Sequence, residues 1–113
     1  MKRILLFLFF IFSSAIYSQY TLIPDQNFEW FLIRQGYDSG PFDGKVLTSN
    51  INTVTKLDFY TGGQNFIVSL KGIEDFTELT ELSITDGSLF TSLDVSKNLA
   101  LTKLICSSNR LSS

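Results

Sequence analysis

The sequence predicts a solenoid of short parallel β-strands that begins with a small helical cap. A nine-residue pattern recurs along residues 54–113, and a helical pattern with an apolar stripe precedes it. The remaining segment is an apolar leader at the N-terminus. Fixed-period repetition of a short unit is the sequence signature of solenoids, in which each unit buries a face that its neighbour covers.

Residues 1–18 have the layout of a secretory signal peptide. Lys2 and Arg3 form a positive start, residues 4–12 are apolar, and residues 13–18 form a more polar exit. This order is typical of an export signal. The apolar stretch is shorter than the about 20 residues that a helix needs to cross a membrane. We therefore expect cleavage after Ser18, no membrane span in the exported chain, and a secreted or surface location.

The composition of residues 19–113 limits the classes of function. Seven of the nine Lys and Arg residues remain against all eleven Asp and Glu, so the exported chain is acidic. No basic stretch is left to neutralise phosphates, which argues against a nucleic-acid partner. The chain has no histidine, which excludes Ser-His-Asp and Cys-His catalytic arrangements and His-based zinc sites. No Gly-rich phosphate loop is present, and we expect no cofactor.

Residues 19–53 are predicted to form the helical cap. Asp25 is a suitable N-cap for a helix through QNFEWFLIRQG that ends at Gly36. An apolar stripe with i, i+3, i+4 spacing should cover the open core of the first strand. This stripe consists of Phe28, Phe31 and Leu32. Trp30 lies off the stripe, where it either folds over an adjacent edge or stays partly exposed.

The segment YDSGPFDGKV carries Asp38 and Asp43 among glycines. A calcium loop needs oxygen ligands at closer intervals, and six to eight of them in all. We therefore favour a pair of turns and no metal site, with calcium at Asp38 and Asp43 as the lesser alternative. After this segment, Thr48 or Ser49 is expected to cap a short helical turn at residues 50–54.

Residues 54–113 contain four copies of the repeat, which begin at Val54, Leu79, Phe90 and Leu101. Slots four and six are apolar and flank an outward slot five, which is the period-two alternation of a half-buried strand. Slot nine is Gly or Asn, both of which suit a tight turn. The predicted structural core consists of Leu57, Phe59, Leu79, Leu82, Ile84, Leu93, Val95, Leu101, Leu104, Cys106, Asn98 and Asn109.

The outward slots combine Thr and Ser with scattered charges and one aromatic side chain, a polar surface suited to adhesion. The half-repeat from Phe90 is expected on the opposite side of the coil. On the strand side, we predict that the ligand-binding residues are Lys56, Asp58, Tyr60, Glu81, Ser83, Thr85, Lys103, Ile105 and Ser107.

The pattern L-x-x-L-x-L-x-x-N, with cysteine allowed at the sixth slot, resembles the leucine-rich-repeat family. The stretch FTSLDVSKNLALTKLICSSNRL, residues 90–111, is similar to half-repeats of exported bacterial leucine-rich-repeat proteins, and residues 23–60 resemble their N-terminal cap. The resemblance implies a leucine-rich-repeat β-solenoid that binds proteins, and sometimes glycans, on its strand face. Two departures stand out. The step from Val54 to Leu79 is twenty-five residues rather than twenty-two, which predicts a loop near TGGQN, and Gly40 stands where related caps often carry Asp.

Catalysis has little support in the sequence. Cys106 occupies an inward slot, where cysteine acts as a small buried hydrophobe. The carboxylate pairs Glu74 with Asp75 and Glu78 with Glu81 are the remaining option, as in a glycoside hydrolase. Glu81 lies on a solvent-facing slot, and solvated charges explain all four residues without further assumption. We therefore expect that the chain is not an enzyme.

These observations lead to a ranked interpretation. The leading hypothesis is a secreted or surface module that binds a protein, or a glycan, without catalysis. The alternative is a structural or degenerate fragment of a longer repeat protein with no binding activity of its own, and the third hypothesis is a carboxylate-based glycoside hydrolase. The last coil would leave Leu104 and Leu111 uncovered, so we expect either further repeats or end-to-end association.

Overall fold

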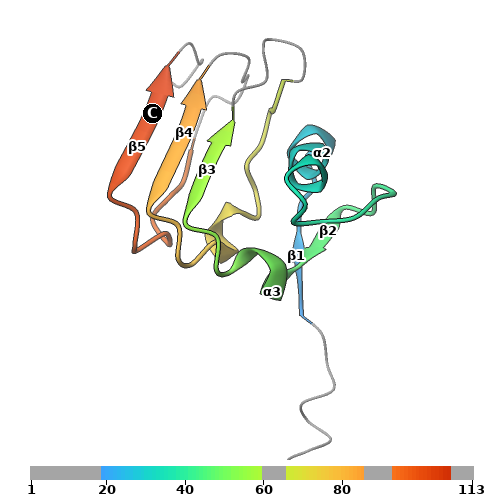
Figure 1. Cartoon of the computed structure of the whole chain (residues 1–113). Helices are drawn as coiled ribbons and strands as arrows, with labels where there is room; N and C mark the ends of the chain where they lie inside the picture. Colours follow the sequence, from blue (N-terminus) through green and yellow to red (C-terminus); the bar gives the residue numbers. More distant parts are fainter. Residues whose placement is uncertain (1–18, 60–65, 86–92, 108–113) are drawn as a thin grey trace, which may run out of the picture.

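The computed structural model describes residues 19–59, 66–85 and 93–107. These residues form a two-stranded antiparallel sheet, a three-stranded parallel sheet and short helices (Figure 1). In chain order the elements are β1 (Tyr20–Leu22), α2 (Gln26–Arg34), β2 (Lys45–Leu47), α3 (Thr48–Ile51), β3 (Lys56–Phe59), the 3-10 turn η2 (Ile73–Asp75), β4 (Glu81–Thr85) and β5 (Lys103–Ser107). No helix in these residues is long and apolar enough to cross a membrane. The predicted signal peptide, the extra loop near TGGQN, Asn109 and Leu111 lie outside the described residues.

The parallel sheet is built from three of the four repeat units. Its order is β3–β4–β5, and Leu57, Leu82 and Leu104 are partners across the three strands. Parallel strands require a crossover connection. In this chain the crossovers include two return segments, residues 66–76 and residues 93–98, which contain no strand. The described part of the unit from Phe90 belongs to the second return segment, so this unit adds no strand to the sheet.

The inward slots of the first two coils are buried. Leu57, Phe59, Leu79, Leu82 and Ile84 are at most 2% exposed. Four of the other predicted core residues are half-buried and pack against these side chains. They are Leu93, Val95, Leu101 and Cys106.

Leu104 departs from its predicted place in the core. Its side chain is 45% exposed, although it occupies the same slot as the buried Leu82. The difference arises because β5 is the edge strand among the described residues, so no further strand covers its inward side chains. Alternation therefore sets the direction of a side chain, and a neighbouring coil is needed to bury it.

The threonine at slot two links successive coils. The Thr80 hydroxyl donates to the Thr55 carbonyl at 3.0 Å, and the Thr102 hydroxyl donates to the Thr80 carbonyl at 3.2 Å. The backbone N–H groups of Thr80 and Thr102 donate to the same two carbonyls. The threonine at slot two, which the sequence places among the outward polar side chains, is therefore part of the stacking between coils.

Asn98 also joins neighbouring coils. This slot-nine side chain is 4% exposed, and its Nδ2 donates to the carbonyls of Ile73 at 2.8 Å and Phe76 at 3.2 Å. Asn was expected at this slot because it tolerates a tight turn. In the structure, the amide also donates to these two carbonyls, which already accept the backbone N–H groups of Phe76 and Leu79, and it thereby ties the second return segment to the first.

Helix α2 packs on the first coil as its apolar stripe predicts. Asp25 is the N-cap, and its Oδ1 accepts hydrogen bonds from the N–H groups of Asn27 and Phe28. The Phe28 and Phe31 rings lie 5.5 and 4.3 Å from the Phe59 ring, measured between centroids. These contacts make the helix and β3 parts of one core.

The second oxygen of Asp25 has a role that capping does not explain. Oδ2 accepts hydrogen bonds from the N–H groups of Val68 at 2.8 Å and Ser69 at 3.0 Å. Asn27 Nδ2 donates to the Phe66 carbonyl nearby. One carboxylate therefore caps α2 and fixes the start of the first return segment against it.

The pairing of β1 with β2 was not predicted, because residues 19–53 were expected to be helical. Thr21 is buried at 3% exposure. Its hydroxyl donates to Asp75 Oδ2 at 2.7 Å and lies 2.8 Å from the Thr48 hydroxyl.

The expectation that Thr48 or Ser49 caps a helix is wrong. Thr48 is the first residue of α3, the N-cap is Leu47, and no side chain caps this helix.

Candidate functional site

The outward side chains of the parallel strands form one continuous surface, here called the strand face. Figure 1 shows the three strands side by side, so their outward side chains stand in rows across the sheet. Within the described residues the strand face consists of Lys56, Asp58, Glu81, Ser83, Thr85, Lys103 and Ile105. Of the other predicted binding residues, Tyr60 lies outside the described residues, and only the backbone of Ser107 is described, at the end of β5.

The first row of the strand face is a set of alternating charges. Glu81 lies between Lys56 and Lys103, with Oε2 3.1 Å from Lys56 Nζ and Oε1 3.8 Å from Lys103 Nζ. The hydrogen bond from Lys56 holds the pKa of Glu81 below its ordinary value, and the charges of both lysines act in the same direction. These groups are solvent-exposed, so they add little to stability. Their consequence is a row with one carboxylate between two ammonium groups.

The second row changes from acidic to apolar across the sheet. Asp58, Ser83 and Ile105 are partners in register, and Asp58 is exposed while Ser83 is half-buried. Ile105 is apolar, yet it occupies an outward slot and is 39% exposed. An exposed branched aliphatic side chain beside polar neighbours is the kind of anchor that a partner protein can desolvate.

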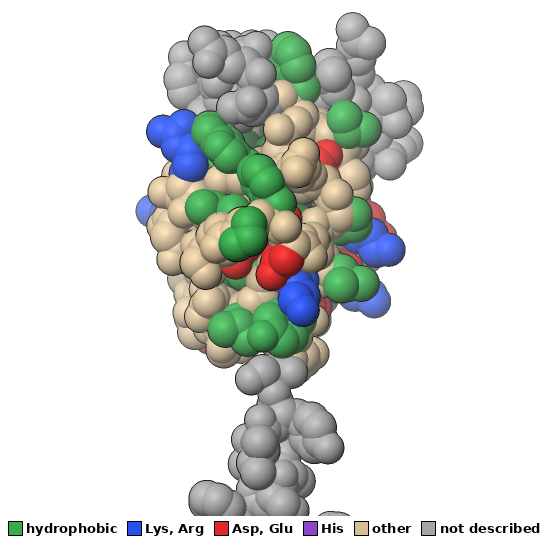
Figure 2. Space-filling view, turned by 90° about the vertical axis from the view of Figure 1, so that its right-hand side faces the viewer, with side chains coloured by type: hydrophobic (Ala, Val, Ile, Leu, Met, Phe, Trp, Pro, Cys, Tyr) green, Lys and Arg blue, Asp and Glu red, His purple; other side chains and the backbone are tan. Residues whose placement is uncertain are grey.

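The end of the molecule that carries α2, β1 and β2 presents hydrophobic side chains among charged ones (Figure 2). Exposed members in this part of the chain include Tyr20, Leu22 and Phe42. Lys45 Nζ lies 4.5 Å from the centre of the Tyr20 ring. Trp30 is half-buried, with the Arg34 guanidinium 4.7 Å from its ring centre. Cation–π contacts of this kind cover part of the exposed aromatic surface.

An acidic cluster in the N-terminal segment was only partly visible in the sequence. Carboxylate oxygens of Glu29, Asp38 and Asp43 lie within 4.8 Å of one another. Asp38 and Asp43 were candidates from the sequence, whereas Glu29 had no expected role beyond its place in the helix. Glu29 is 1% exposed, and its two oxygens accept hydrogen bonds from the N–H groups of Asp43 and Gly44, each at 3.0 Å. The buried carboxylate therefore shapes the loop that leads into β2.

Burial raises the pKa of Glu29 above its ordinary value of 4.5, because desolvation penalises the charged carboxylate. The N–H groups of Asp43 and Gly44 oppose this increase, while the Asp43 carboxylate adds to it. The folded chain consequently holds a proton on Glu29 more tightly than the unfolded chain does.

This shift predicts a specific pH dependence of stability. Because the folded-state pKa of Glu29 is raised, the folded state binds more protons between the ordinary pKa and the raised one, and the free energy of unfolding falls as pH rises through that window. We expect Glu29→Gln to remove this decrease. The measurement is urea unfolding at a series of pH values from acidic to neutral, and parallel curves for the two proteins would contradict the prediction.

Glu81→Gln serves as the matched control, because it should have the opposite effect. The pKa of Glu81 is lowered, so its contribution to stability is present above the ordinary pKa and is lost as pH falls through the lowered one. Replacing Glu81 should therefore reduce the loss of stability in acid, whereas replacing Glu29 should reduce the loss towards neutral pH. Effects of the same sign would contradict at least one of the two assignments.

Three of the four carboxylates considered for hydrolysis have hydrogen-bond or ion-pair partners in the described residues, and the fourth, Glu78, is exposed. Asp75 accepts a hydrogen bond from Thr21, and Glu74 Oε2 accepts one from the N–H of Gly72 at 2.9 Å. Glu81 is bound to lysines, and its lowered pKa is the reverse of what a general acid needs. Glu29 has a raised pKa, but it is buried beneath its loop. These observations argue against the glycoside hydrolase.

Cys106 lies in β5 with Ile84 as its partner in register. The residue is half-buried, and desolvation raises the pKa of its thiol. A raised pKa lowers the thiolate fraction at neutral pH, and the thiolate is the reactive form. Cys106 therefore acts as a packing residue at slot six.

Comparison with known proteins identifies the fold. No protein-family model matches the chain, and no curated protein matches it. An internalin (inlF) from Listeria monocytogenes str. 4b F2365 matches with a TM-score of 0.68 and 24% identity over 81% of this chain and 26% of that chain. The functional domain of InlJ from Listeria monocytogenes matches with a TM-score of 0.51 and 24% identity over 84% of this chain and 25% of that chain. The chain has a leucine-rich-repeat fold.

Two differences from these structures are relevant. The chain spans about a quarter of the length of each of them. The InlJ domain includes a cysteine ladder, whereas this chain has one cysteine, and the neighbour of Cys106 in β4 is Ile84. At slot six, the described coils stack Phe59, Ile84 and Cys106 instead.

Proposed function

We propose that the chain is an exported, non-catalytic binding module that recognises a protein through its strand face. The observation that carries this proposal is the in-register arrangement of the outward side chains. Lys56, Glu81 and Lys103 stand in one row, and Asp58, Ser83 and Ile105 in the next. Adjacent strands lie about 4.8 Å apart, so these rows form a rigid surface on which charged, polar and apolar groups keep fixed spacings.

The chemistry of the strand face favours a protein partner. Glu81 lies within ion-pair distance of Lys56 and Lys103, so one carboxylate and two ammonium groups stand together on this surface. The exposed Ile105 provides apolar area beside them. A polar rim around an apolar anchor is the usual composition of protein interfaces. A glycan site would be expected to offer an aromatic stacking surface, and the described part of the strand face has none.

The organisation of the chain fits this role. We assign residues 1–18 to an export signal, residues 19–53 to a cap and residues 54–113 to the repeats. Contacts of the Phe28 and Phe31 rings with Phe59 support the cap assignment, because they cover the first coil with apolar side chains from the N-terminal segment. The assignment of the export signal rests on the charge and apolar pattern of the sequence.

The alternative function is that of a structural part of a longer repeat protein. Its support is the exposed Leu104 at the edge of the described sheet, together with the 90% exposure of Leu99. Further repeats or a second copy joined end to end would cover such surface. In this case the strand face of the described coils would contribute little affinity of its own.

An array experiment tests the proposed function. Residues 19–113 are purified and applied to an array of purified extracellular proteins and to a glycan array. We expect saturable binding to a protein and about tenfold weaker binding by Ile105→Asp, because burying an aliphatic side chain is worth about 1.5–3 kcal/mol. Leu99→Asp is the matched control, since it also replaces an exposed aliphatic residue but lies outside the strand face.

The outcomes are distinct. Equal losses for Ile105→Asp and Leu99→Asp, or no binding to either array, would refute binding through the strand face. Binding to the glycan array alone would mean that the partner is a carbohydrate and not a protein.

A further inference from the structure

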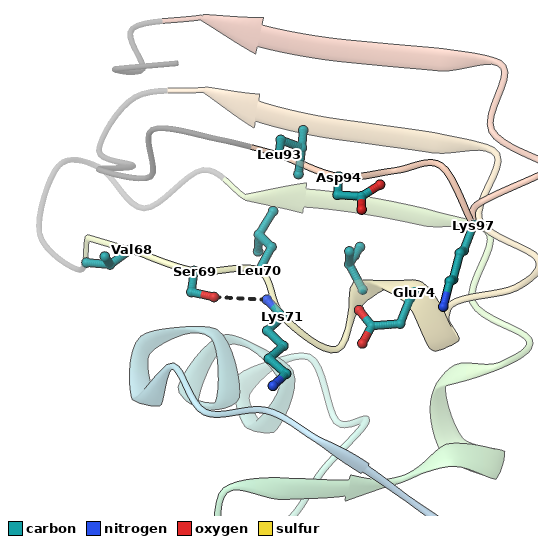
Figure 3. Close-up of a pocket in the computed structure, with 9 residues that line it drawn as sticks. Val68, Ser69, Leu70, Lys71, Glu74, Leu93, Asp94 and Lys97 are labelled. Atoms are coloured by element: carbon teal, nitrogen blue, oxygen red, sulfur yellow. Dashed lines mark hydrogen bonds between the residues drawn. The ribbon is translucent and has the colours of Figure 1, made fainter. Parts of the chain in front are cut away.

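A cavity of about 370 Å³ lies between the two return segments and has no assigned role. Its lining residues come from the ranges 68–74 and 93–97, and none of them belongs to β3, β4 or β5 (Figure 3). The cavity is therefore separate from the strand face. Its volume lies within the range of about 300–1,000 Å³ that is typical of small-ligand sites.

Part of the lining is aliphatic and well supported by the core. Leu70 and Ile73 are 7% and 3% exposed, and Leu93 is half-buried against the same core. Leu70 and Ile73 are held from behind and expose little of their own surface, so most of the apolar area open to a ligand belongs to the half-buried Leu93 and to Val68, which is 61% exposed. A ligand that covers them gains affinity from removing this surface from water.

The polar part of the lining has equal numbers of opposite charges. Lys71 and Glu74 come from the first return segment, and Asp94 and Lys97 come from the second. Glu74 and Lys97 lie at the end of the cavity beside η2 (Figure 3). Neither lysine forms an ion pair within the described residues. Both ammonium groups are thus available to a ligand.

Each of the two carboxylates accepts a hydrogen bond from a backbone N–H group two residues away in the chain. Glu74 Oε2 accepts a hydrogen bond from the N–H of Gly72, and Asp94 Oδ1 accepts one from the N–H of Ser96 at 2.9 Å. The hydroxyl and the N–H of Ser96 keep the pKa of Asp94 below its ordinary value. The charge of Lys97 acts in the same direction on Asp94, so the site presents two backbone-held carboxylates beside two lysines that form no ion pair among the described residues.

This combination restricts the class of ligand. A phosphate or a nucleic acid would meet two carboxylates, and a divalent cation would meet two lysines, so neither is favoured by Coulomb's law. A quaternary ammonium group is commonly recognised on aromatic rings, and none of the described residues that line this cavity is aromatic. A ligand with both charges and an aliphatic centre complements every part of the lining.

We propose that this cavity binds a short peptide segment in which an aliphatic side chain is flanked by one basic and one acidic side chain. The aliphatic side chain covers Leu70, Ile73 and Leu93. The acidic side chain of the peptide pairs with a lysine of the lining, and its basic side chain pairs with Glu74 or Asp94. The proposal adds a second binding surface to the chain and does not depend on recognition through the strand face.

Defined peptides test the proposal. The probes are two acetylated and amidated tripeptides, lysine–leucine–glutamate and glutamate–leucine–lysine, titrated into residues 19–113 by isothermal calorimetry. We expect one-to-one binding of at least one of them. Replacing the central leucine by serine should weaken that binding about tenfold or more, which corresponds to the burial of one aliphatic side chain. Equal binding of the serine peptides, or no binding of either leucine peptide at millimolar concentration, would overturn the proposal.

Variants locate the binding on the molecule. Lys97→Glu and Asp94→Lys change exposed residues of the lining, so we expect them to fold as shown by unchanged thermal unfolding, and to weaken binding of the preferred tripeptide about two- to fivefold. Leu93→Asp should reduce binding further. Lys103→Glu on the strand face is the matched control and should leave the affinity unchanged.

The control also separates this proposal from the proposed function. A loss caused by Lys103→Glu but not by Lys97→Glu would place the peptide on the strand face and overturn the cavity as its site. Concentration-dependent self-association that Leu93→Asp abolishes, without peptide binding, would show that a second copy of the chain occupies the cavity instead.

Discussion

Phe59→Ala is expected to lower the free energy of unfolding by about 3–5 kcal/mol, as is typical when a large aromatic side chain is removed from a core. Phe59 is fully buried, and its ring contacts those of Phe28 and Phe31. Phe28 in turn stacks on Phe76 from the first return segment, with 6.2 Å between ring centroids. The substitution would therefore leave a void where the N-terminal segment, β3 and the return segment meet. Small domains are stable by about 5–15 kcal/mol in all, so the loss is a large fraction of the total.

Urea unfolding followed by fluorescence measures this effect, because Trp30 is the one tryptophan and lies in α2. Circular dichroism of the same samples follows the whole chain. Phe42→Ala is the matched control, since Phe42 is 46% exposed and should change stability by less than about 1 kcal/mol. If Phe59→Ala shifted only the tryptophan signal, then α2 would unfold independently of the coils, and the single shared core inferred here would be wrong.

Gly72→Ala is expected to cost about 2–5 kcal/mol, from two sources. The backbone of Gly72 has φ +107°, a region that L-residues adopt at a cost of about 1–2 kcal/mol. A β-carbon at this position would also lie 2.7 Å from the Leu22 carbonyl oxygen and would collide with the Ile23 side chain. Overpacking of this kind typically costs about 1–3 kcal/mol. The measurement is again the midpoint and slope of urea unfolding.

Gly36→Ala separates the two sources. Gly36 also has a positive φ, +86°, but a β-carbon there would meet nothing within 4 Å. We expect it to cost about 1–2 kcal/mol from backbone strain alone. The excess cost of Gly72→Ala over Gly36→Ala then measures how closely the first return segment packs on β1. Equal costs for the two substitutions would mean that this packing tolerates a methyl group and that β1 is not held in place by it.

The sequence was sufficient to predict the elements whose residues follow a short-range rule. Alternation at slots four to six indicated the strands that became β3, β4 and β5, and the spacing of Phe28, Phe31 and Leu32 indicated a helix with one buried stripe. Asp25 could be recognised as an N-cap because capping involves residues only two or three positions away. These features are local, so periodicity and residue type contain the necessary information.

Contacts between distant residues were not accessible in the same way. The pairing of β1 with β2, the bond between Thr21 and Asp75, and the second role of Asp25 at Val68 and Ser69 all join positions far apart in the chain. No period or spacing encodes such contacts. The N-terminal segment was therefore expected to be helical, and Asp75 was expected to be a solvated surface charge.

The same distinction between local patterns and contacts of distant residues applies to the candidate sites. Which side chains belong to the strand face followed from alternation alone, whereas their pairing, with Glu81 between Lys56 and Lys103, depends on the register between coils. The exposure of Leu104 also required the structure, because burial depends on a neighbouring strand and not on the residue itself. The cavity between the return segments had no signal in the sequence, since Lys71, Glu74, Asp94 and Lys97 become neighbours only when two coils stack. The repeat and the direction of its side chains follow from the periodicity of residue types, whereas contacts between coils govern which of these side chains meet.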